Sequence, residues 1–418
     1  MAQIVTTPHF YGWRVVTAAF VLAVFGWGLG FYGPPVYLHA VREARGFSIE
    51  LVSAAVTVHY LFGAVVVANL PKLHRWFGLP SVTSTGVVAL ALGLLGWALA
   101  HEPWQLFLAT LLTGGGWVTM GAAAINAILE PWFVRLRPKA LSMAYNGASI
   151  GGVIFSPLWV FLIGHFGFAV SAAMIGGVAI LVVFWLSLTV FSKTPSALGQ
   201  QPDGEALTPA THPAASAIPR LEGQVLWQDR KFLTLAAGMA LGLFAQIGLL
   251  AHLFSLIVPA LGATVAGIVM GLATGSAIAG RSAFGWFISA STDRRLAAMM
   301  SYAIQIAGAF ALIASDTREP VLIISGILLF GFGIGNATSL PPLIAQVEFA
   351  REDAPRVVAL IVALGQASYA FAPIIFGFLR AGWEQEAGAV PVFALAIMCK
   401  VAAIAAFQSG RPARRGRA

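Results

Sequence analysis

The stretch "KTPSALGQQPDGEALTPATHPAASAIPRLEGQ" (residues 193–224) interrupts an otherwise apolar chain near its middle. It is rich in Pro, Ala, Ser, Thr and Gly, a composition typical of a flexible linker and not of a helix or strand. Residues 192–231 therefore predict a linker between two parts of the chain, 1–191 and 232–410. A short basic tail follows at 411–418.

The composition is that of a membrane protein. Of the 418 residues 59% are apolar and only 10% are charged, whereas soluble domains carry about 25% charged residues. Apolar runs of about 20 residues, the length that crosses a bilayer, occur six times on each side of the linker. They lie near 13–35, 49–70, 79–100, 104–128, 139–164, 167–191, 232–260, 262–290, 296–315, 321–346, 356–379 and 388–408. Because no alternating short-strand pattern occurs, we predict an all-α protein with twelve transmembrane helices and not a β-barrel.

The basic residues predict an orientation. If the N-terminus is cytoplasmic, 18 of the 24 Lys and Arg residues lie in cytoplasmic segments, and only Arg281 and Lys400 lie inside spans. The positive-inside rule then places both termini in the cytoplasm and the chain in an inner or plasma membrane. The net charge of +8 therefore reflects orientation and not nucleic-acid binding. We expect the basic tail to contact anionic lipid headgroups.

The two parts of the chain align with each other at one constant offset, the separation between Gly114 and Gly331. Six matches occur in this single register without a gap. They are Glu102-Pro103 with Glu319-Pro320, Gly114 with Gly331, Gly116 with Gly333, Gly63 with Gly280, and Pro138 with Pro355. Both copies begin on the same side of the membrane, so the sequence predicts two parallel six-helix halves related by an axis along the membrane normal.

Two parallel six-helix halves joined by a cytoplasmic loop resemble the major facilitator superfamily. The segment "GRSAFGWFISASTDRR" (280–295) is similar to that family's signature between paired spans, a glycine followed by Asp-Arg-Arg. Its counterpart "NLPKLHRWFG" (69–78) has no acidic residue before Arg75. The resemblance implies a secondary transporter that works by alternating access.

A single cation stands in the eighth span, in "GSAIAGRSAFGWF" (275–287). Counted back from Asp293, Arg281 lies about 18 Å into the helix, where a charge costs at least about 2.5–3.5 kcal/mol. The repeat has Ala64 at this position, so the architecture does not require a cation, and no acidic residue lies deep in any span. Guanidinium holds a carboxylate through two parallel hydrogen bonds. We predict that Arg281 binds an anionic substrate; a structural role, with carbonyls and water as partners, is the alternative.

A closer resemblance rests on "YGWRVVTAAF" (11–20), on "PWFVRLRPKALSMAYNGASIGGVIF" (131–155) and on the eighth-span arginine. These segments are similar to the monocarboxylate transporter family and its bacterial relatives, including oxalate/formate exchangers. In that family the eighth-span arginine binds the substrate carboxylate, a role that the resemblance assigns to Arg281. Animal members have an aspartate where this chain has Ala277 and a lysine where it reads "GFYGPP" (30–35). The proton relay built on that Lys–Asp pair does not transfer.

Two histidines inside spans are candidates for proton coupling. His252 lies in the seventh span, near a histidine of the bacterial relatives, and we assign it substrate or proton binding. His59, in the middle of the second span, is the second proton candidate. Histidine can take up and release a proton near neutral pH without a neighbouring acid. A hydrogen-bonded core histidine is the alternative for both.

Four further residues are predicted to line the substrate cavity: Asn336, Tyr369, Trp117 and Tyr32. Asn336 matches Arg281 in depth, and Trp117 lies level with it in the first half; plain packing is the alternative. Lys400 is expected to extend its ammonium group to the membrane surface. The small residues of "NGASIGG" (146–152) are expected to form a sliding surface against the eighth span.

We therefore predict a secondary active transporter of a small organic anion, with a monocarboxylate and proton symport as first choices. Anion exchange or efflux is the alternative, and a non-transporting membrane sensor is a remote one. No phosphate-binding loop, metal-ligand spacing or nucleophile elbow occurs. We accordingly expect no enzyme activity, cofactor, metal or nucleotide. The expected partners are the anion, a proton and the lipid bilayer, and the expected functional unit is a monomer.

Overall fold

The computed structural model describes residues 10–204, 225–287, 293–316, 318–350, 352–383 and 389–411. The first half contains helices α1 (Gly12–Gly30), α2 (Pro34–Arg45), α3 (Ile49–Phe77), α4 (Leu79–Leu99), α5 (Pro103–Val118), α6 (Ala122–Leu129) and α7 (Arg137–Leu186). The second contains α8 (Arg230–Phe287), α9 (Arg294–Ala314), α10 (Pro320–Ala337), α11 (Leu340–Glu348), α12 (Ala354–Ala370), α13 (Ala372–Trp383) and α14 (Val390–Ser409).

Within the described residues the structure has 10 helical segments that are long and apolar enough to cross a membrane. Two of them, α7 and α8, each contain a glycine with left-handed backbone dihedrals, Gly167 (φ 74°) and Gly262 (φ 73°), where two helices meet. A side chain would strain the backbone at these turns. The expected twelve separate runs therefore appear as ten helical segments, two of which are helix pairs.

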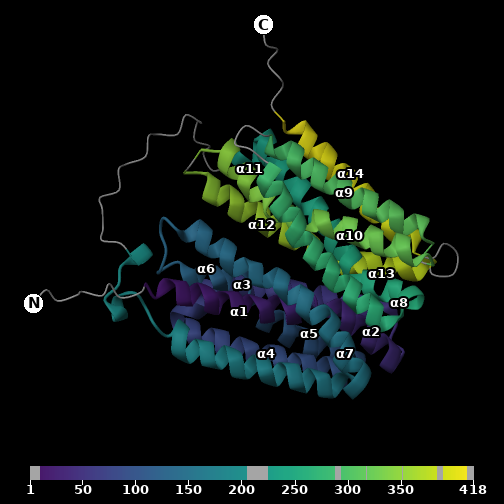
Figure 1. Cartoon of the computed structure of the whole chain (residues 1–418), viewed down its shortest axis with the longest axis horizontal. Helices are drawn as coiled ribbons and strands as arrows, with labels where there is room; N and C mark the ends of the chain where they lie inside the picture. The colour runs from purple at the N-terminus through teal and green to yellow at the C-terminus, as the bar shows by residue number, and fades with distance from the viewer. Residues whose placement is uncertain are drawn as a thin grey trace, which may run out of the picture.

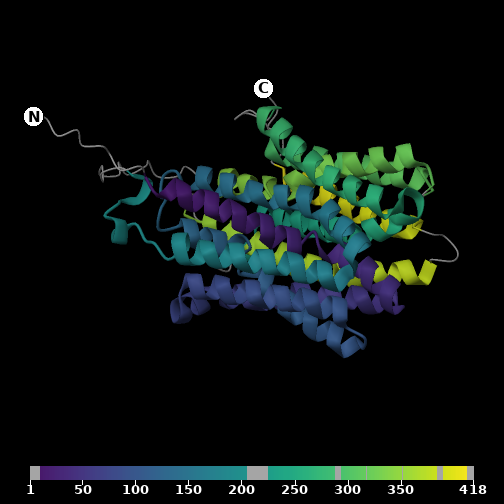
Figure 2. The ribbon, with the colours of Figure 1, turned by 60° about the horizontal axis from the view of Figure 1, so that its bottom comes forward.

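The helices run back and forth between two ends of the bundle. We call the end at Tyr11 and Gly410 the terminal end, and the end with the glycine turns at 46, 167 and 262 the far end. In Figure 1, α1–α7 form the lower half and α8–α14 the upper half. Figure 2, turned about the horizontal axis, shows most helices of both halves running along the same long direction.

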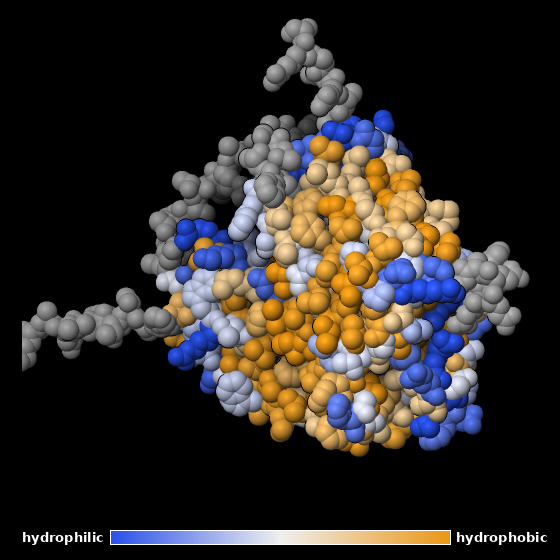
Figure 3. All heavy atoms as spheres, turned by 45° about the vertical axis from the view of Figure 1, so that its right-hand side comes forward, coloured by the Kyte–Doolittle hydropathy of each residue, from blue (hydrophilic) through white to orange (hydrophobic). Residues whose placement is uncertain are grey.

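Large apolar side chains cover the outside of the bundle. Leu181, Val321 and Met398 are exposed by 73%, 78% and 61%. Figure 3 shows apolar residues across the middle of one face, with hydrophilic residues toward its edges. Such a surface is stable against lipid tails and not against water.

The internal repeat is visible in the helix contacts. Gly114 and Gly116 of α5 pack against the backbones of α3 and α4, at His59 and Gly86. Their repeat partners on α10, at positions 331 and 333, pack in the same way against α8 and α9. Glu102 and Glu319 precede the prolines that begin α5 and α10. The glycines matched by the offset thus occupy equivalent close contacts between helices.

Four of the predicted spans are broken into two helices. The break between α1 and α2 falls just before Pro34 and Pro35, and α12 gives way to α13 just before Pro373. The breaks between α5 and α6 and between α10 and α11 were not predicted. The first contains no proline, whereas Pro341 and Pro342 begin α11. Pro157 lies inside α7, where the backbone keeps helical dihedrals.

Contacts between the halves gather toward the far end. Among the described residues, side-chain contacts join α3 to α12 and α13, α2 to α8, and α7 to α8. They include Thr57 with Ile374, Tyr60 with Tyr369, His39 with Phe254, and Val160 with Gly267. The halves are therefore closed against each other at the far end.

The expected sliding surface on the fifth span is present only in part. Gly152 faces the second half, where a Cβ would lie 2.6 Å from Thr274 Cγ2. Gly147 and Gly151 pack against the backbone of α1 instead. Residue spacing predicted the small-residue stripe but not which partner each glycine meets.

The first residues of the expected linker are ordered against the first half. The carboxylate of Asp203 accepts hydrogen bonds from the backbone N–H groups of Val134, Arg135 and Leu136 at the start of α7. An acidic side chain is stabilising at a helix N-terminus. Residues 205–224 of the linker and 412–418 of the basic tail lie outside the described residues.

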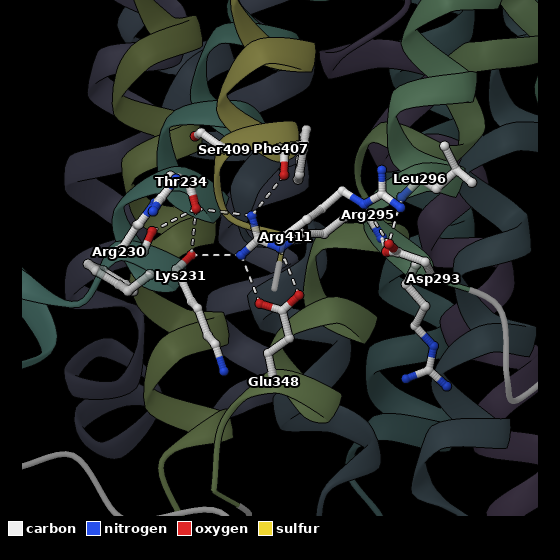
Figure 4. Close-up of polar contacts among 12 residues, drawn as sticks. Arg230, Lys231, Thr234, Asp293, Arg295, Leu296, Glu348, Phe407, Ser409 and Arg411 are labelled. Carbon is white, nitrogen blue, oxygen red and sulfur yellow. Dashed lines mark hydrogen bonds and ion pairs between the residues drawn. The ribbon is translucent and has the colours of Figure 1, made fainter. Parts of the chain in front are cut away.

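Charged residues form a network at the terminal end of the second half (Figure 4). Arg295, only 1% exposed, donates to both carboxylate oxygens of Glu348 at 2.7 and 2.8 Å. It also donates to Thr234 and to two backbone carbonyls. This network belongs to the Asp-Arg-Arg signature, and its counterpart is absent around Arg75, which has no ion-pair partner among the described residues.

Asp293 completes this network. Burial alone would raise the pKa of its carboxyl group. Hydrogen bonds from Arg411 (2.6 Å) and from the backbone N–H groups of Leu296 and Arg295 outweigh burial and hold the pKa below its usual range. The carboxylate therefore stays charged and caps α9.

Lys400 does not reach the membrane surface as expected. Its side chain is fully buried on α14, with Nζ 4.8 Å from the ring centre of Phe330 and no hydrogen-bond partner in the described part of the chain. The prediction was wrong because Lys400 lies in the middle of α14 and faces the bundle, whereas extension to the membrane surface requires a position near a helix end.

Breaking the buried Arg295–Glu348 pair should destabilise the protein far more than breaking an exposed pair. Glu348→Gln leaves a buried guanidinium uncompensated and should cost about 3 kcal/mol. Glu130→Gln removes the exposed Arg137–Glu130 contact at 3.5 Å and should cost less than about 1 kcal/mol. Apparent melting temperatures in detergent measure both; equal losses would contradict this ranking.

Candidate functional site

Arg281 lies on α8 at the boundary between the halves. It is half-buried, and its Nε donates to the backbone carbonyl of Gly335 at 3.2 Å. In the described residues the terminal nitrogens Nη1 and Nη2 have no hydrogen-bond or ion-pair partner. These two nitrogens form the edge of guanidinium that binds a carboxylate with two hydrogen bonds.

The carbonyl that holds Arg281 is presented by a close helix crossing. At Gly335 on α10 a Cβ would collide with the carbonyl oxygen of Ala277 on α8. Only glycine permits this approach. The next residue, Asn336, is 2% exposed, and its Nδ2 has no hydrogen-bond partner in the described part of the chain. A second donor without an acceptor thus lies beside the arginine's carbonyl contact.

Tyr32 connects the first half to this arginine. It lies in the break between α1 and α2, beside Thr274 on α8, since a Cβ on Gly152 would lie 2.8 Å from both Tyr32 Cε2 and Thr274 Oγ1. It is also close enough to Arg281 to interact electrostatically. The break that Pro34 imposes on the first span therefore brings a hydroxyl group of one half to the cation of the other.

A continuous group of aromatic rings extends from Tyr32, and we call it the aromatic wall. It consists of Trp27, Phe31, Tyr32, Tyr60, Trp117 and Tyr369. Adjacent ring centres are 5.0 to 6.4 Å apart, the usual range for edge-to-face or tilted pairs. Among the described residues the indole Nε1 of Trp117 has no hydrogen-bond partner. The predicted cavity residues Tyr32, Trp117 and Tyr369 thus lie in one cluster.

His59 is held at the back of this wall. Its Nε2 lies 2.9 Å from the carbonyl of Gly30, which Pro34 leaves without its helical donor. Its Nδ1 lies 2.9 Å from the hydroxyl of Thr113, and its ring stacks on Trp117 at 6.0 Å. The hydroxyl can donate to a neutral ring or accept from a protonated one, because it also lies 3.3 Å from the carbonyl of Thr110.

His252 lies elsewhere. It is fully buried on α8. Along the helix axis it lies about 15 Å from the far-end turn at Gly262, whereas Arg281 lies about 28 Å beyond that turn, a difference in depth of about 13 Å. Its Nε2 donates to the carbonyl of Pro373 at 3.0 Å, and its Nδ1 has no partner in the described residues. The structure does not bring His252 together with Arg281.

A small cavity lies on the far-end side of the aromatic wall. It measures about 20 Å³ and is lined mainly by Phe31, Tyr32, Tyr60, Leu250 and Met270. That is roughly the room one water molecule needs. The far-end contact is therefore tightly packed beyond the level of the arginine.

Sequence reasoning missed the contact that fastens the far end. The hydroxyl of Thr57 on α3 accepts a hydrogen bond from the backbone N–H of Ile374, in the first turn of α13, at 3.1 Å. Helix N-termini leave such N–H groups without intrahelical partners. A side chain of one half thus caps a helix of the other. Pro373 signalled a helix start, but nothing in the sequence identified Thr57 as its partner.

The family model described as Major Facilitator Superfamily matches residues 16–373. The chain belongs to the major facilitator superfamily. The MFS transporter asaE of Aspergillus flavus is 24% identical over 384 residues, 88% of this chain and 80% of that protein. Monocarboxylate transporter 13 of Bos taurus is 27% identical over 176 residues, 41% of this chain and 40% of that protein. The resemblance to monocarboxylate transporters is thus distant and partial.

Solved structures of two transporters share the fold. The nucleoside transporter NupG superposes with a TM-score of 0.72 at 14% identity, covering 96% of this chain and 100% of that chain. A bacterial homologue of the human lysosomal transporter Spinster, in an inward-facing and unoccupied conformation, gives 0.62 at 13% identity, covering 96% and 94%. At this identity the likeness shows the fold alone.

The hydrogen bond between Thr57 and Ile374 predicts that removing it opens the far end more often. Thr57→Val removes the acceptor for Ile374 N–H and should cost the closed far end about 1 kcal/mol, a shift of about fivefold toward the open far end. Spin labels at Glu43 and Ala263, in a Cys399→Ser background, would measure the distance across the far end. Thr57→Ser keeps the hydroxyl and is the control; an unchanged distance distribution in Thr57→Val would contradict the prediction.

Proposed function

We propose that this membrane transporter moves a small organic anion, a monocarboxylate, by alternating access. The observation that carries the proposal is the guanidinium of Arg281, which lies half-buried between the halves without an anionic partner in the described residues. A buried cation is stable only with a counter-charge or strong acceptors. A substrate carboxylate on Nη1 and Nη2 supplies that charge.

In this proposal the chain crosses the membrane twelve times, and the terminal end is cytoplasmic. The distribution of Lys and Arg supports this orientation. The far-end contacts then close the outer side, so the substrate meets Arg281 from the cytoplasm in this state. Release to the outside requires the Thr57–Ile374 contact to open and the terminal end to close.

The geometry favours His59 over His252 as the carrier of a coupling proton. Both ring nitrogens of His59 have partners, and Thr113 can serve either protonation state. Protonation of His252 at Nδ1 would place an N–H without an acceptor among the described residues, within the electrostatic range of Arg380 and Arg42. We therefore propose symport in which His59 takes the proton.

Anion exchange remains the second candidate because of the same arginine. An empty carrier would have to close around an uncompensated cation, which is costly in a low-dielectric interior. A carrier that closes well only when loaded favours exchange of one anion for another. Counterflow without net uptake would identify exchange.

The direct test is uptake into proteoliposomes for a set of labelled monocarboxylates. Arg281→Ala should lower affinity or uptake by about 30-fold or more, since losing one partner of a buried charge pair costs about 2–5 kcal/mol. Arg281→Lys keeps the charge but loses the planar pair of donors, so it should recover only a part. Full uptake by Arg281→Ala would make the arginine structural.

Proton coupling has its own test. An inward pH gradient should stimulate uptake by the wild-type protein and by His252→Gln, but not by His59→Gln, because glutamine hydrogen-bonds without titrating. Gradient-stimulated uptake that survives in His59→Gln would place the proton elsewhere, for example on the substrate itself.

A further inference from the structure

We propose that the substrate is an arylcarboxylate, a monocarboxylate with an aromatic ring, whose carboxylate binds Arg281 of the second half and whose ring binds the aromatic wall, which comes mostly from the first half. The inference rests on the proposed function and adds the chemical class of the substrate.

The first argument is depth. Trp27, Trp117 and Tyr369 lie about 18–23 Å from the terminal end, and so does Gly335, whose carbonyl holds Arg281. Each depth is counted from the residue that ends the helical segment at the terminal end: Gly12 for Trp27, Leu129 for Trp117, Ala354 for Tyr369 and Glu348 for Gly335. The rings and the cation therefore occupy one layer of the bundle, and Tyr32 of the wall lies within electrostatic range of Arg281.

The second argument is exposure. Trp27, Phe31, Tyr32 and Tyr369 are only partly buried, although they lie in the middle of the bundle on helices that face the other half. The ring of Trp27 is directed inward, since its neighbours are Trp117 at 6.2 Å on α5 and Tyr145 at 6.3 Å on α7. The wall therefore presents ring surface to the region between the halves, where a ligand can cover it.

The third argument comes from the internal repeat. If the rings were needed only for packing, the equivalent positions of the second half would carry rings too. At the offset that pairs Gly114 with Gly331, only Trp27 of the first-half rings has an aromatic partner. The pairs are Trp27 with Phe244, Phe31 with Gly248, Tyr32 with Leu249, Tyr60 with Ala277, and Trp117 with Ile334. The fold thus does not require these rings, as it does not require Arg281, whose partner is Ala64.

The chemistry of the wall selects the ligand. Aromatic rings at these distances stack on or meet the edge of another ring, while a formate- or acetate-sized anion would leave the wall uncovered. Two donors without partners among the described residues, Trp117 Nε1 and Asn336 Nδ2, add hydrogen bonds for a polar substituent. A substrate of this class bridges the halves, with its charge on one and its ring on the other.

Matched ligand pairs test the proposal. Binding to the detergent-purified protein would be measured for acetate and phenylacetate, and for pyruvate and phenylpyruvate. Cyclohexylacetate separates aromatic from merely apolar contact, and 2-phenylethanol lacks the carboxylate. We expect each phenyl acid to bind at least tenfold more tightly than its small partner. Phenylacetate should bind at least about threefold more tightly than cyclohexylacetate, and 2-phenylethanol should bind far more weakly than phenylacetate.

A variant pair locates the effect. Trp27→Leu should reduce the phenylacetate-to-acetate affinity ratio about five- to tenfold. Tyr32→Leu should reduce this ratio by a similar factor and replaces Trp27→Leu if that variant does not fold. Trp104→Leu changes a tryptophan that is 64% exposed on the outside of α5 and should leave the ratio unchanged. Equal binding of small and phenyl acids overturns the arylcarboxylate proposal but leaves carboxylate transport standing. Absence of binding by every carboxylate overturns both.

Discussion

The hydrocarbon interior offers no water, so a polar group there must find its partner within the protein. The broken helices follow this constraint closely. Pro34 leaves the carbonyl of Gly30 without a helical donor, and this carbonyl accepts a hydrogen bond from His59. The carbonyl of Leu29 accepts one from the hydroxyl of Tyr37. The same constraint makes the groups without partners informative.

Lys400 and Arg281, the two cations that the sequence places inside spans, differ in their surroundings. Lys400 is sealed inside the second half against Phe330. Arg281 lies at the boundary between the halves, half-buried, with one nitrogen fixed by Gly335 and two nitrogens free of partners in the described residues. Of these two cations, Arg281 is partly exposed and has a first-half residue, Tyr32, within electrostatic range, whereas Lys400 is fully buried.

The parallel repeat allows the two halves to diverge in chemistry while keeping one architecture. The second half supplies the cation and the tight glycine crossing that holds it. The first half supplies most of the rings and His59. In the proposed function, binding needs both halves, so a bound anion would stabilise the arrangement in which they meet, and an empty site would leave a charge uncompensated. Substrate binding and conformational change would then be coupled through one electrostatic interaction.

Much of the fold could be predicted from the sequence. Span length, the linker and the constant offset depend on hydrophobicity and spacing, which are local properties. The predicted depth of Arg281 was counted back from Asp293 across residues 288–292, which lie outside the described residues, so it stays a prediction. Three features could not be predicted, because they depend on how helices face one another. They are the inward direction of Lys400, the separation of His252 from Arg281 and the pairing of Thr57 with Ile374. The break after α5 carries no proline, whereas the one after α10 is followed by Pro341 and Pro342 at the start of α11, a signal that the sequence analysis did not use.

The most direct test of the account is an experimental structure of the protein with 4-bromophenylacetate, in which anomalous scattering locates the bromine. The account predicts the carboxylate within about 3 Å of Nη1 and Nη2 of Arg281 and the bromophenyl ring against Trp27 and Trp117. A carboxylate bound away from Arg281, with the guanidinium still held only by Gly335, would contradict it.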